Sequence, residues 1–269
     1  MSLGFSVETL LPYARVTGAP RMGLVRLGES DWLDAAPDLA ARAEVFEAHT
    51  ECVMALPEAG AAIAELSDVL RVQGGLEACG RAHWEDFCLL VQDRRGEPYR
   101  LVAGALAFPT DWHLPEKLGL PMGAVHAPIH GYAGQLERGV DRFMDGLKEG
   151  QIFGRANVFV QPSPALRYLP GALAGAGYSH ITPDNAGETL WIRSERQSLR
   201  RLPESGAIVF AIGIYRTRLD ALSDAAVERL ALSLTGFGAG ELDRRAGPLY
   251  AQGLAAYADA RKRRSGAQD

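Results

Sequence analysis

The sequence lacks most of the features that quickly assign a class to a protein. It contains three cysteines in 269 residues and no Cys-x-x-Cys pair, which indicates neither a disulfide framework nor a cysteine-held iron–sulfur cluster. No apolar run reaches the roughly 18 residues that a membrane-spanning helix needs. Residues 1–12 have no basic segment followed by an apolar one, so we expect no signal peptide, no membrane partner and a cytoplasmic location.

The chain also lacks an excess of positive charge and the common catalytic motifs. The formal net charge is −5, from 28 Lys and Arg against 33 Asp and Glu, which argues against duplex nucleic acid as the main partner. The chain has no Gly-x-x-x-x-Gly-Lys-Ser/Thr loop, no Gly-x-Gly-x-x-Gly between a strand and a helix, no Gly-x-Ser-x-Gly and no His-Glu-x-x-His. These absences disfavour nucleotide binding, serine hydrolysis and zinc-dependent proteolysis.

What remains is the composition of an ordinary globular protein, 47% apolar and 23% charged, with enough apolar residues to form a core. Residues 1–36 are expected to be irregular, and Ser223 is expected to cap a helix. The other predicted elements are two helices within 38–70 divided at Pro57, a hairpin of 87–91 and 99–108, an irregular stretch at 109–132, a helix at 133–148, strands at 157–161, 189–193 and 207–215, and helices at 224–234 and 248–264.

Strands that follow one another without regular alternation with helices favour an α+β fold with an antiparallel sheet over a doubly wound α/β fold. We therefore predict one domain over residues 1–269. Its parts would be an N-terminal helical part at 1–75, a sheet core at 86–216 and C-terminal helices at 217–269 that flank the sheet.

The segment His126-Ala-Pro-Ile-His-Gly-Tyr132 is the most informative one for function. Pro128 and Gly131 disfavour a helix there. A histidine held rigidly in a loop suits a metal ligand, and imidazole is the commonest protein ligand of haem iron. Spacing alone favours the alternative, in which these histidines pack or hydrogen-bond within a proline-rich loop.

A second segment, residues 195–203, holds a glutamate and three arginines just before the predicted strand at 207–215. Guanidinium groups bind carboxylates in a bidentate manner, so anion binding is one interpretation. An internal ion-pair network, or a turn held by Glu195 with Arg196 or Arg200, is the other. Arg155 and Asn157 add polar groups at the entrance of a predicted strand.

Several blocks occur in a characteristic order: residues 100–112 with 116–119, His126-x-Pro-x-x-Gly-Tyr132, residues 140–143, Arg155-x-Asn157 and residues 195–208. Together they resemble the α-subunit family of haem-dependent oxidative N-demethylases, over roughly residues 10–235. The resemblance implies haem b bound by a PAS-like α+β fold. It also implies a monooxygenase that uses O₂ to remove an N-methyl group from a small secondary amine, with release of formaldehyde.

On this interpretation the iron is held by His126, with His130 and His113 as alternatives. The cofactor-binding residues would be Arg196, Arg200 and Arg201, paired with the propionates, together with Tyr132, Arg155 and Asn157. Glu195 would receive the cationic amine, because a buried ammonium needs a carboxylate or its equivalent.

The chain has no nicotinamide fingerprint, no flavin motif and no cluster-forming cysteines, so electrons would come from a separate reductase. Two positions depart from the family pattern: His130 replaces a proline, and Gly213 replaces an arginine that precedes Tyr215 by two residues. If that arginine serves the active pocket, the substrate or the activity would differ. The rival hypotheses are a non-catalytic haem or ligand sensor, in which two histidines close the iron, and an interaction scaffold without haem.

Overall fold

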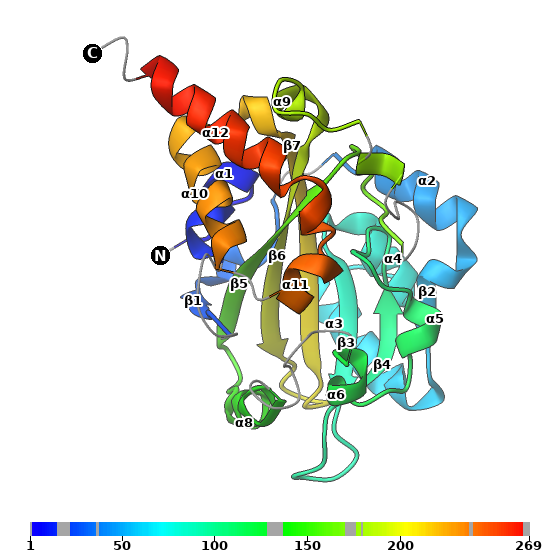
Figure 1. Ribbon diagram of the computed structural model, residues 1–269. Helices are drawn as coiled ribbons and strands as arrows, with labels where there is room; N and C mark the ends of the chain where they lie inside the picture. Colours follow the sequence, from blue (N-terminus) through cyan, green and yellow to red (C-terminus); the bar gives the residue numbers. More distant parts are fainter. Residues whose placement is uncertain are drawn as a thin grey trace.

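A seven-stranded antiparallel sheet lies at the centre of the molecule, in the order β1-β5-β6-β7-β3-β4-β2 (Figure 1). The computed structural model describes residues 2–14, 22–35, 38–127, 137–169, 176–178, 180–236 and 239–265. The strands are β1 (Val25–Leu27), β2 (Val53–Ala55), β3 (Asp86–Val91), β4 (Arg100–Ala105), β5 (Ile152–Gln161), β6 (Trp191–Arg201) and β7 (Ile208–Arg218).

Helices surround this sheet, several of them only one turn long. The α-helices are α1 (Val7–Leu10), α2 (Ala40–Ala48), α3 (Gly60–Leu70), α4 (Gly75–Ala82), α5 (Leu114–Lys117), α6 (Met122–Val125), α8 (Glu137–Gly146), α9 (Ala186–Thr189), α10 (Asp224–Thr235), α11 (Ala239–Arg244) and α12 (Ala251–Ser265). The 3₁₀ helices are η1 (Leu11–Tyr13), η2 (Glu29–Asp31), η3 (Thr50–Cys52), η4 (Pro57–Ala59), η5 (Ala176–Tyr178), η6 (Leu219–Ala221) and η7 (Gly247–Leu249).

The two faces of the sheet differ chemically, and the side chains of the long strand β6 alternate between them. It pairs with β5 from Gln161↔Trp191 to Ile152↔Arg200 without a register shift, and with β7 along its whole length. Directly opposed residues share a face, and successive residues alternate. We call one side the site face, which carries Arg155, Asn157, Glu195, Gln197 and Ile212, and the other the core face, which carries Ala156, Ser194, Arg196, Ser198 and Ala211.

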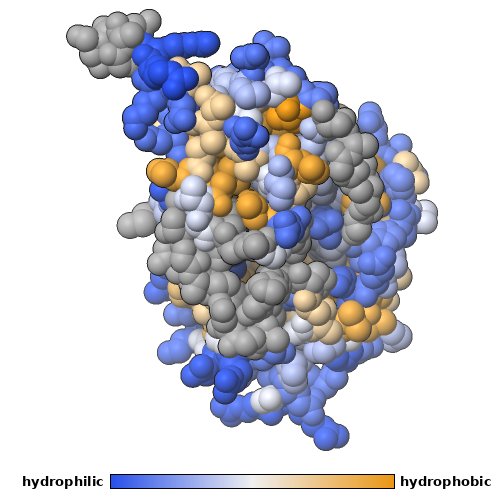
Figure 2. Space-filling view, viewed as in Figure 1, coloured by the Kyte–Doolittle hydropathy of each residue, from blue (hydrophilic) through white to orange (hydrophobic). Residues whose placement is uncertain are grey.

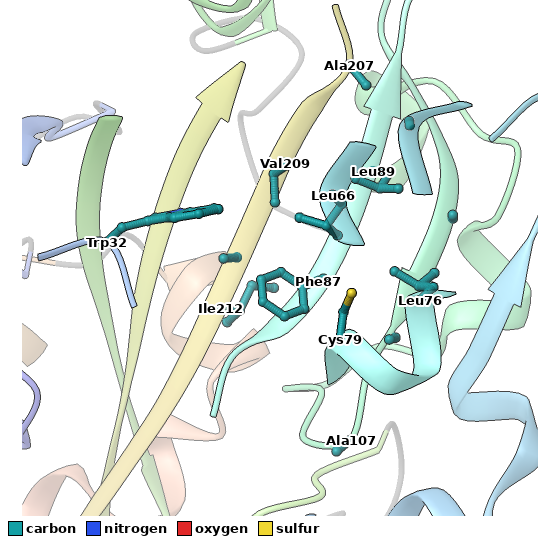
Figure 3. Close-up of a cluster of buried hydrophobic side chains, with 14 of the residues drawn as sticks. Trp32, Leu66, Leu76, Cys79, Phe87, Leu89, Ala107, Ala207, Val209 and Ile212 are labelled. Atoms are coloured by element: carbon teal, nitrogen blue, oxygen red, sulfur yellow. The ribbon is translucent and has the colours of Figure 1, made fainter. Parts of the chain in front are cut away.

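Most of the largest hydrophobic cluster lies on the core face, and Ile212 and Ile214, which also belong to it, alternate onto the site face. Apolar side chains of α3 and α4 pack there against β3 and β7, and Figure 3 shows the Trp32 ring directed toward Val209, with Leu66 and Phe87 beyond it. Each large apolar side chain buried in this way contributes about 1.5–3 kcal/mol. A second cluster at the β5 side joins α1, α10 and α12 to the sheet through residues such as Val158 and Ile192.

The site face is covered at one end by α5, α6 and α8. Leu114, Met122 and Met144 from these helices pack against Leu90 and Leu199 of the sheet. Figure 1 shows α6 and α8 at the lower end of the sheet and α11 in front of β6 and β7. Between these helices, the middle of β5 and β6 carries polar side chains on this face.

The sequence-based expectation of a mixed helix and sheet fold with an antiparallel sheet is confirmed, as are the hairpin of β3 and β4 and the cap of α10, where Ser223 Oγ accepts from the Ala226 amide. Other details were wrong. The N-terminal segment contains α1 and β1, residues 109–127 contain α5 and α6, and β2 and α4 were missed. The most consequential difference is in β6: residues 195–201 continue the strand and do not form a turn.

The described surface in Figure 2 is mainly hydrophilic, with its hydrophobic residues gathered mostly in the upper half. Leu232 and Leu249 are the large apolar side chains that the described residues expose, at 54% and 46%. Within the same residues, every helix is either too short or too polar to span a lipid bilayer.

A buried polar cluster lies at the edge of the core face, around Glu85. Glu85 is 1% exposed, its Oε1 accepts from the Asp34 amide at 2.9 Å, and Oε2 has no hydrogen bond among the described residues. Tyr215 donates to Asp34 Oδ2 at 3.0 Å. Burial raises the pKa of Glu85 to about 7, although the Asp34 amide and the charge of Arg196 oppose the rise.

This pKa makes Glu85 a source of pH-dependent stability. The folded carboxyl binds its proton more tightly than the unfolded one, so its stabilising contribution is present at low pH and is lost between about pH 4.5 and pH 7. Glu85→Gln keeps the acceptor oxygen and cannot ionise. We expect its free energy of unfolding, relative to the wild type, to rise by up to about 3 kcal/mol between pH 4.5 and pH 8, measured by urea denaturation. A difference independent of pH would contradict this prediction.

Candidate functional site

His126 follows α6 directly, at the covered end of the site face. Its Nδ1 lies 2.9 Å from the Met122 carbonyl oxygen, one helical turn earlier. A carbonyl can only accept, so Nδ1 carries the proton and Nε2 carries the lone pair of the neutral ring. An Nδ1–H···O=C bond is the usual way in which a protein orients a metal-binding imidazole.

The charges around His126 show which elements meet there. Burial lowers the pKa of His126, the cations of Arg155 and Lys117 lower it further, and the carboxylate of Glu195 opposes them. The neutral ring, which is the form that binds a metal, is thereby favoured. Charged residues of β5 and β6 that are far from His126 in sequence therefore act electrostatically on its ring.

Those polar residues form a chain of hydrogen bonds across the two strands. Arg155 Nη2 donates to Asn157 Oδ1 at 2.9 Å, and Asn157 Nδ2 donates to Glu195 Oε2 at 3.2 Å. Gln197 Nε2 donates to the same oxygen at 2.8 Å. Asn157 lies directly opposite Glu195 and Arg155 directly opposite Gln197. We call these four residues the strand quartet.

The alternation of β5 explains the quartet's position. Ile152, Gly154, Ala156 and Val158 point into the core face, and the residues between them are partly exposed on the site face. On β7, Ile212 and Ile214 lie opposite Gln197 and Glu195 and are 6% and 1% exposed. The quartet is therefore bordered by apolar side chains along β7.

Two of the three arginines predicted to bind propionates lie on the other side of the sheet. Arg196 and Arg200 occupy the core face because they alternate with Glu195 and Gln197 along β6. Arg196 is 1% exposed and donates to the carbonyls of Gly4, Asp31 and Trp32. Arg200 pairs with Glu29. The structure does not bring these two guanidinium groups to His126.

Arg201 lies on the site face, but its donors bind the protein itself. It donates to the carbonyls of Met144, Leu147 and Gly206 and to the Tyr99 hydroxyl. Arg201 thus secures the end of α8 and the turn between β6 and β7.

The alternative iron ligands are placed differently. His113 precedes α5, and its charge acts on Glu51 together with those of His49 and Arg167. His130 and Tyr132 lie outside the described residues.

Position 213, where the resemblance led us to expect an arginine, is also on the core face. Gly213 lies opposite Arg196, and a Cβ atom there would lie 3.1 Å from the Tyr215 ring and 3.5 Å from Glu85 Oε1. Gly213 therefore lies on the face opposite to the strand quartet.

Gln197 and Lys117 were not singled out from the sequence. Gln197 would have been found had the strand been extended past Arg193, because a residue two places from Glu195 shares its face. Lys117 carries no sequence signal beyond its charge.

A protein-family model described as haem-dependent oxidative N-demethylase, alpha subunit-like, matches residues 70–243. The chain belongs to this family. The matched region contains His126, the strand quartet and all of β3 to β7.

The residues on the site face fit the haem dependence that the family name states. A porphyrin supplies four nitrogen ligands to its iron, so a single oriented side chain can complete the attachment, and the imidazole of His126, held by its Nδ1–H bond, is of a suitable kind. Arg155 and Lys117 add positive charge near that imidazole, as propionates require. The apolar side chains of α5, α6 and α8 suit the body of a macrocycle.

The assignment of Arg196 to the core face can be tested through stability. Arg196→Ala leaves one buried and two partly buried carbonyls without their donor, so we expect a loss of at least about 3 kcal/mol. Arg200→Ala breaks a pair whose acidic partner is 68% exposed, and the expected loss is about 1 kcal/mol. Equal losses in chemical denaturation would contradict the difference in burial.

Proposed function

We propose that this protein is a haem-dependent oxygenase that removes an N-methyl group oxidatively from a small amine. The observation that carries the proposal is the oriented, neutral imidazole of His126 beside Arg155 and Glu195 on the site face. The family membership supports haem dependence and oxidative demethylation. The type of haem, haem b, is part of the proposal, as are the substrate class and the release of formaldehyde.

Haem, when bound, would supply the activation of O₂ and the oxidation of the N-methyl carbon. His126 would hold the iron through Nε2, and the Met122 carbonyl keeps the ring in that orientation. Besides His126, the members of the predicted cofactor-binding set that the described residues place on this face are Arg155, Asn157 and Arg201. Because Arg201 donates to carbonyls of the protein itself, we propose Arg155 as a propionate partner. Tyr132 remains a predicted member of the set.

Glu195 is proposed as the group that receives the substrate's ammonium. It is 7% exposed, and its carboxylate is held in place by Asn157 and Gln197. In the overall reaction, the methylated amine, O₂, two electrons and two protons yield the demethylated amine, formaldehyde and water. A separate reductase would deliver the electrons, in line with the family description as an alpha subunit.

A PAS-like arrangement of the sheet is also part of the proposal. The five longer strands lie side by side in the order β5-β6-β7-β3-β4. The first and the last of these five along the sequence, β3 and β7, are therefore neighbours in the middle of the sheet. The site face between β4 and β5 is covered by the segment that connects these two strands, which includes α5, α6 and α8. This arrangement is consistent with a pocket between sheet and connection.

His126 should be required for haem binding. We expect the wild type to take up one haem per chain, with a Soret band and a high-spin ferrous form that binds CO. His126→Ala should weaken haem binding at least tenfold or shift the Soret band, because the oriented ligand is lost. His113→Ala is the matched control and should leave the spectrum unchanged. Absence of stoichiometric haem in the wild type would overturn the proposal.

The reaction itself can be followed by formaldehyde release. With a chemical or enzymatic reductant, O₂ and dimethylamine or another small N-methylated amine, we expect stoichiometric formaldehyde and demethylated product. A six-coordinate, low-spin haem without turnover would instead favour the rival function, a haem-based sensor in which a second side chain closes the iron.

A further inference from the structure

Among the described residues, the hydrogen bonds to the Glu195 carboxylate all fall on one of its two oxygens. Both amide donors of the strand quartet, from Asn157 at 3.2 Å and Gln197 at 2.8 Å, bind the same atom, Oε2. Oε1 has no hydrogen bond to any residue in the described part of the chain. The two oxygens of this carboxylate are therefore chemically unequal.

The arrangement of Oε2 is enforced from both sides. The Asn157 carbonyl oxygen accepts from Arg155 at 2.9 Å, so its amide nitrogen must face Glu195. Gln197 lies on the same face two residues beyond Glu195, and its nitrogen approaches the same oxygen. Two N–H donors on one oxygen fix the rotation of the carboxylate and leave Oε1 in a defined direction.

The surroundings of Glu195 limit what can pair with Oε1. The side chain is 7% exposed, and Ile214 lies directly opposite on β7 with Ile212 next to it. The guanidinium of Arg193, two residues earlier on the same strand, acts electrostatically on this carboxylate, but its donors bind Thr110 and the carbonyls of Phe108 and Leu166. A largely buried carboxylate oxygen without a hydrogen bond is costly. A suitable partner would therefore combine an N–H donor for Oε1 with apolar groups that can contact the two isoleucine side chains.

We propose that Asn157 and Gln197 are positioning residues that make Glu195 a one-oxygen acceptor and thereby set the selectivity of the site. An alkylammonium ion needs a single acceptor oxygen for one N–H, and its alkyl groups can contact the isoleucines. A guanidinium or amidinium ion binds a carboxylate best through two parallel bonds to both oxygens, and Oε2 is already filled. This inference rests on the proposed function for the location of the substrate.

Calorimetric titration of the haem-loaded protein with dimethylammonium chloride and methylguanidinium chloride tests the proposal. We expect the wild type to bind dimethylammonium at least tenfold more tightly than methylguanidinium. Glu195→Gln should lose at least tenfold in dimethylammonium affinity. Glu85→Gln, which neutralises a buried glutamate on the core face, is the matched control and should bind like the wild type.

The positioning role has its own readout. Removing the donors in Asn157→Ala, Gln197→Ala and the double variant exposes Oε2, so the preference for dimethylammonium over methylguanidinium should fall stepwise. A merely structural role would weaken both ligands equally. Thermal melts check that each variant is folded. If Gln197→Ala fails to fold, Gln197→Met replaces it, because methionine removes the donor at nearly constant volume.

The two proposals fail in different ways. If haem is bound and formaldehyde is formed but Glu195→Gln binds dimethylammonium as tightly as the wild type, or the selectivity is unchanged in the double variant, the selectivity proposal is overturned. If the protein takes up no haem, calorimetry of the haem-free chain still applies. A Glu195-dependent preference for dimethylammonium would then support the selectivity proposal while the proposed function falls.

Discussion

The alternation of side chains along β6 is the constraint on which the two faces of this protein depend. Because β6 is paired on both sides over ten or more residues without a shift, no side chain can change face without moving its neighbours. Arg196 thereby becomes a buried core residue, and Glu195, its neighbour in sequence, becomes part of the site. Slipping the register by one residue would exchange these roles.

Buried guanidinium groups hold the irregular segments onto this sheet. Arg42 and Arg193 are both 0% exposed. Arg193 donates to Thr110 and to the carbonyls of Phe108 and Leu166, and Arg42 donates to those of Gly80 and Glu85 and pairs with Asp86 at 2.8 Å. Backbone carbonyls without secondary-structure partners need donors when buried. Each arginine supplies several N–H donors, so one side chain stabilises two or three irregular segments at once.

This use of arginine explains why the sequence predicted the sheet better than the site. Apolar runs such as residues 87–91 and 207–215 identify strands by themselves, and Ser223 identifies a helix start. Residues 195–201 carry four charges in seven positions, which is typical of a solvated turn, and their true environment depends on carbonyl groups from distant segments. Neither periodicity nor spacing contains that information.

Four residues of the candidate site were singled out one by one from the sequence, but their arrangement was not predictable. His126, Arg155, Asn157 and Glu195 were all singled out, yet their convergence requires β5 to pair with β6 and α6 to fold back onto the site face. The arginines were assigned to one site because they are adjacent in sequence, and adjacency in a strand separates side chains. The helix α6, which lies between Pro121 and His126, has only four residues, too few to show a helical hydrophobic period.

Gly213 shows how the two faces can vary independently. A side chain there would press against the Tyr215 ring. The Tyr215 hydroxyl donates to Asp34, and the charge of Glu85 acts on the same hydroxyl. Glycine allows that ring to lie close to the strand, where the carboxyl groups of Asp34 and Glu85 and the guanidinium of Arg196 act electrostatically on one another. A second arginine at 213 would need this space and a new arrangement of Tyr215. The departure at 213 therefore lies in the packing of the core face, on the opposite side of the sheet from Glu195 and the donors that orient its carboxylate.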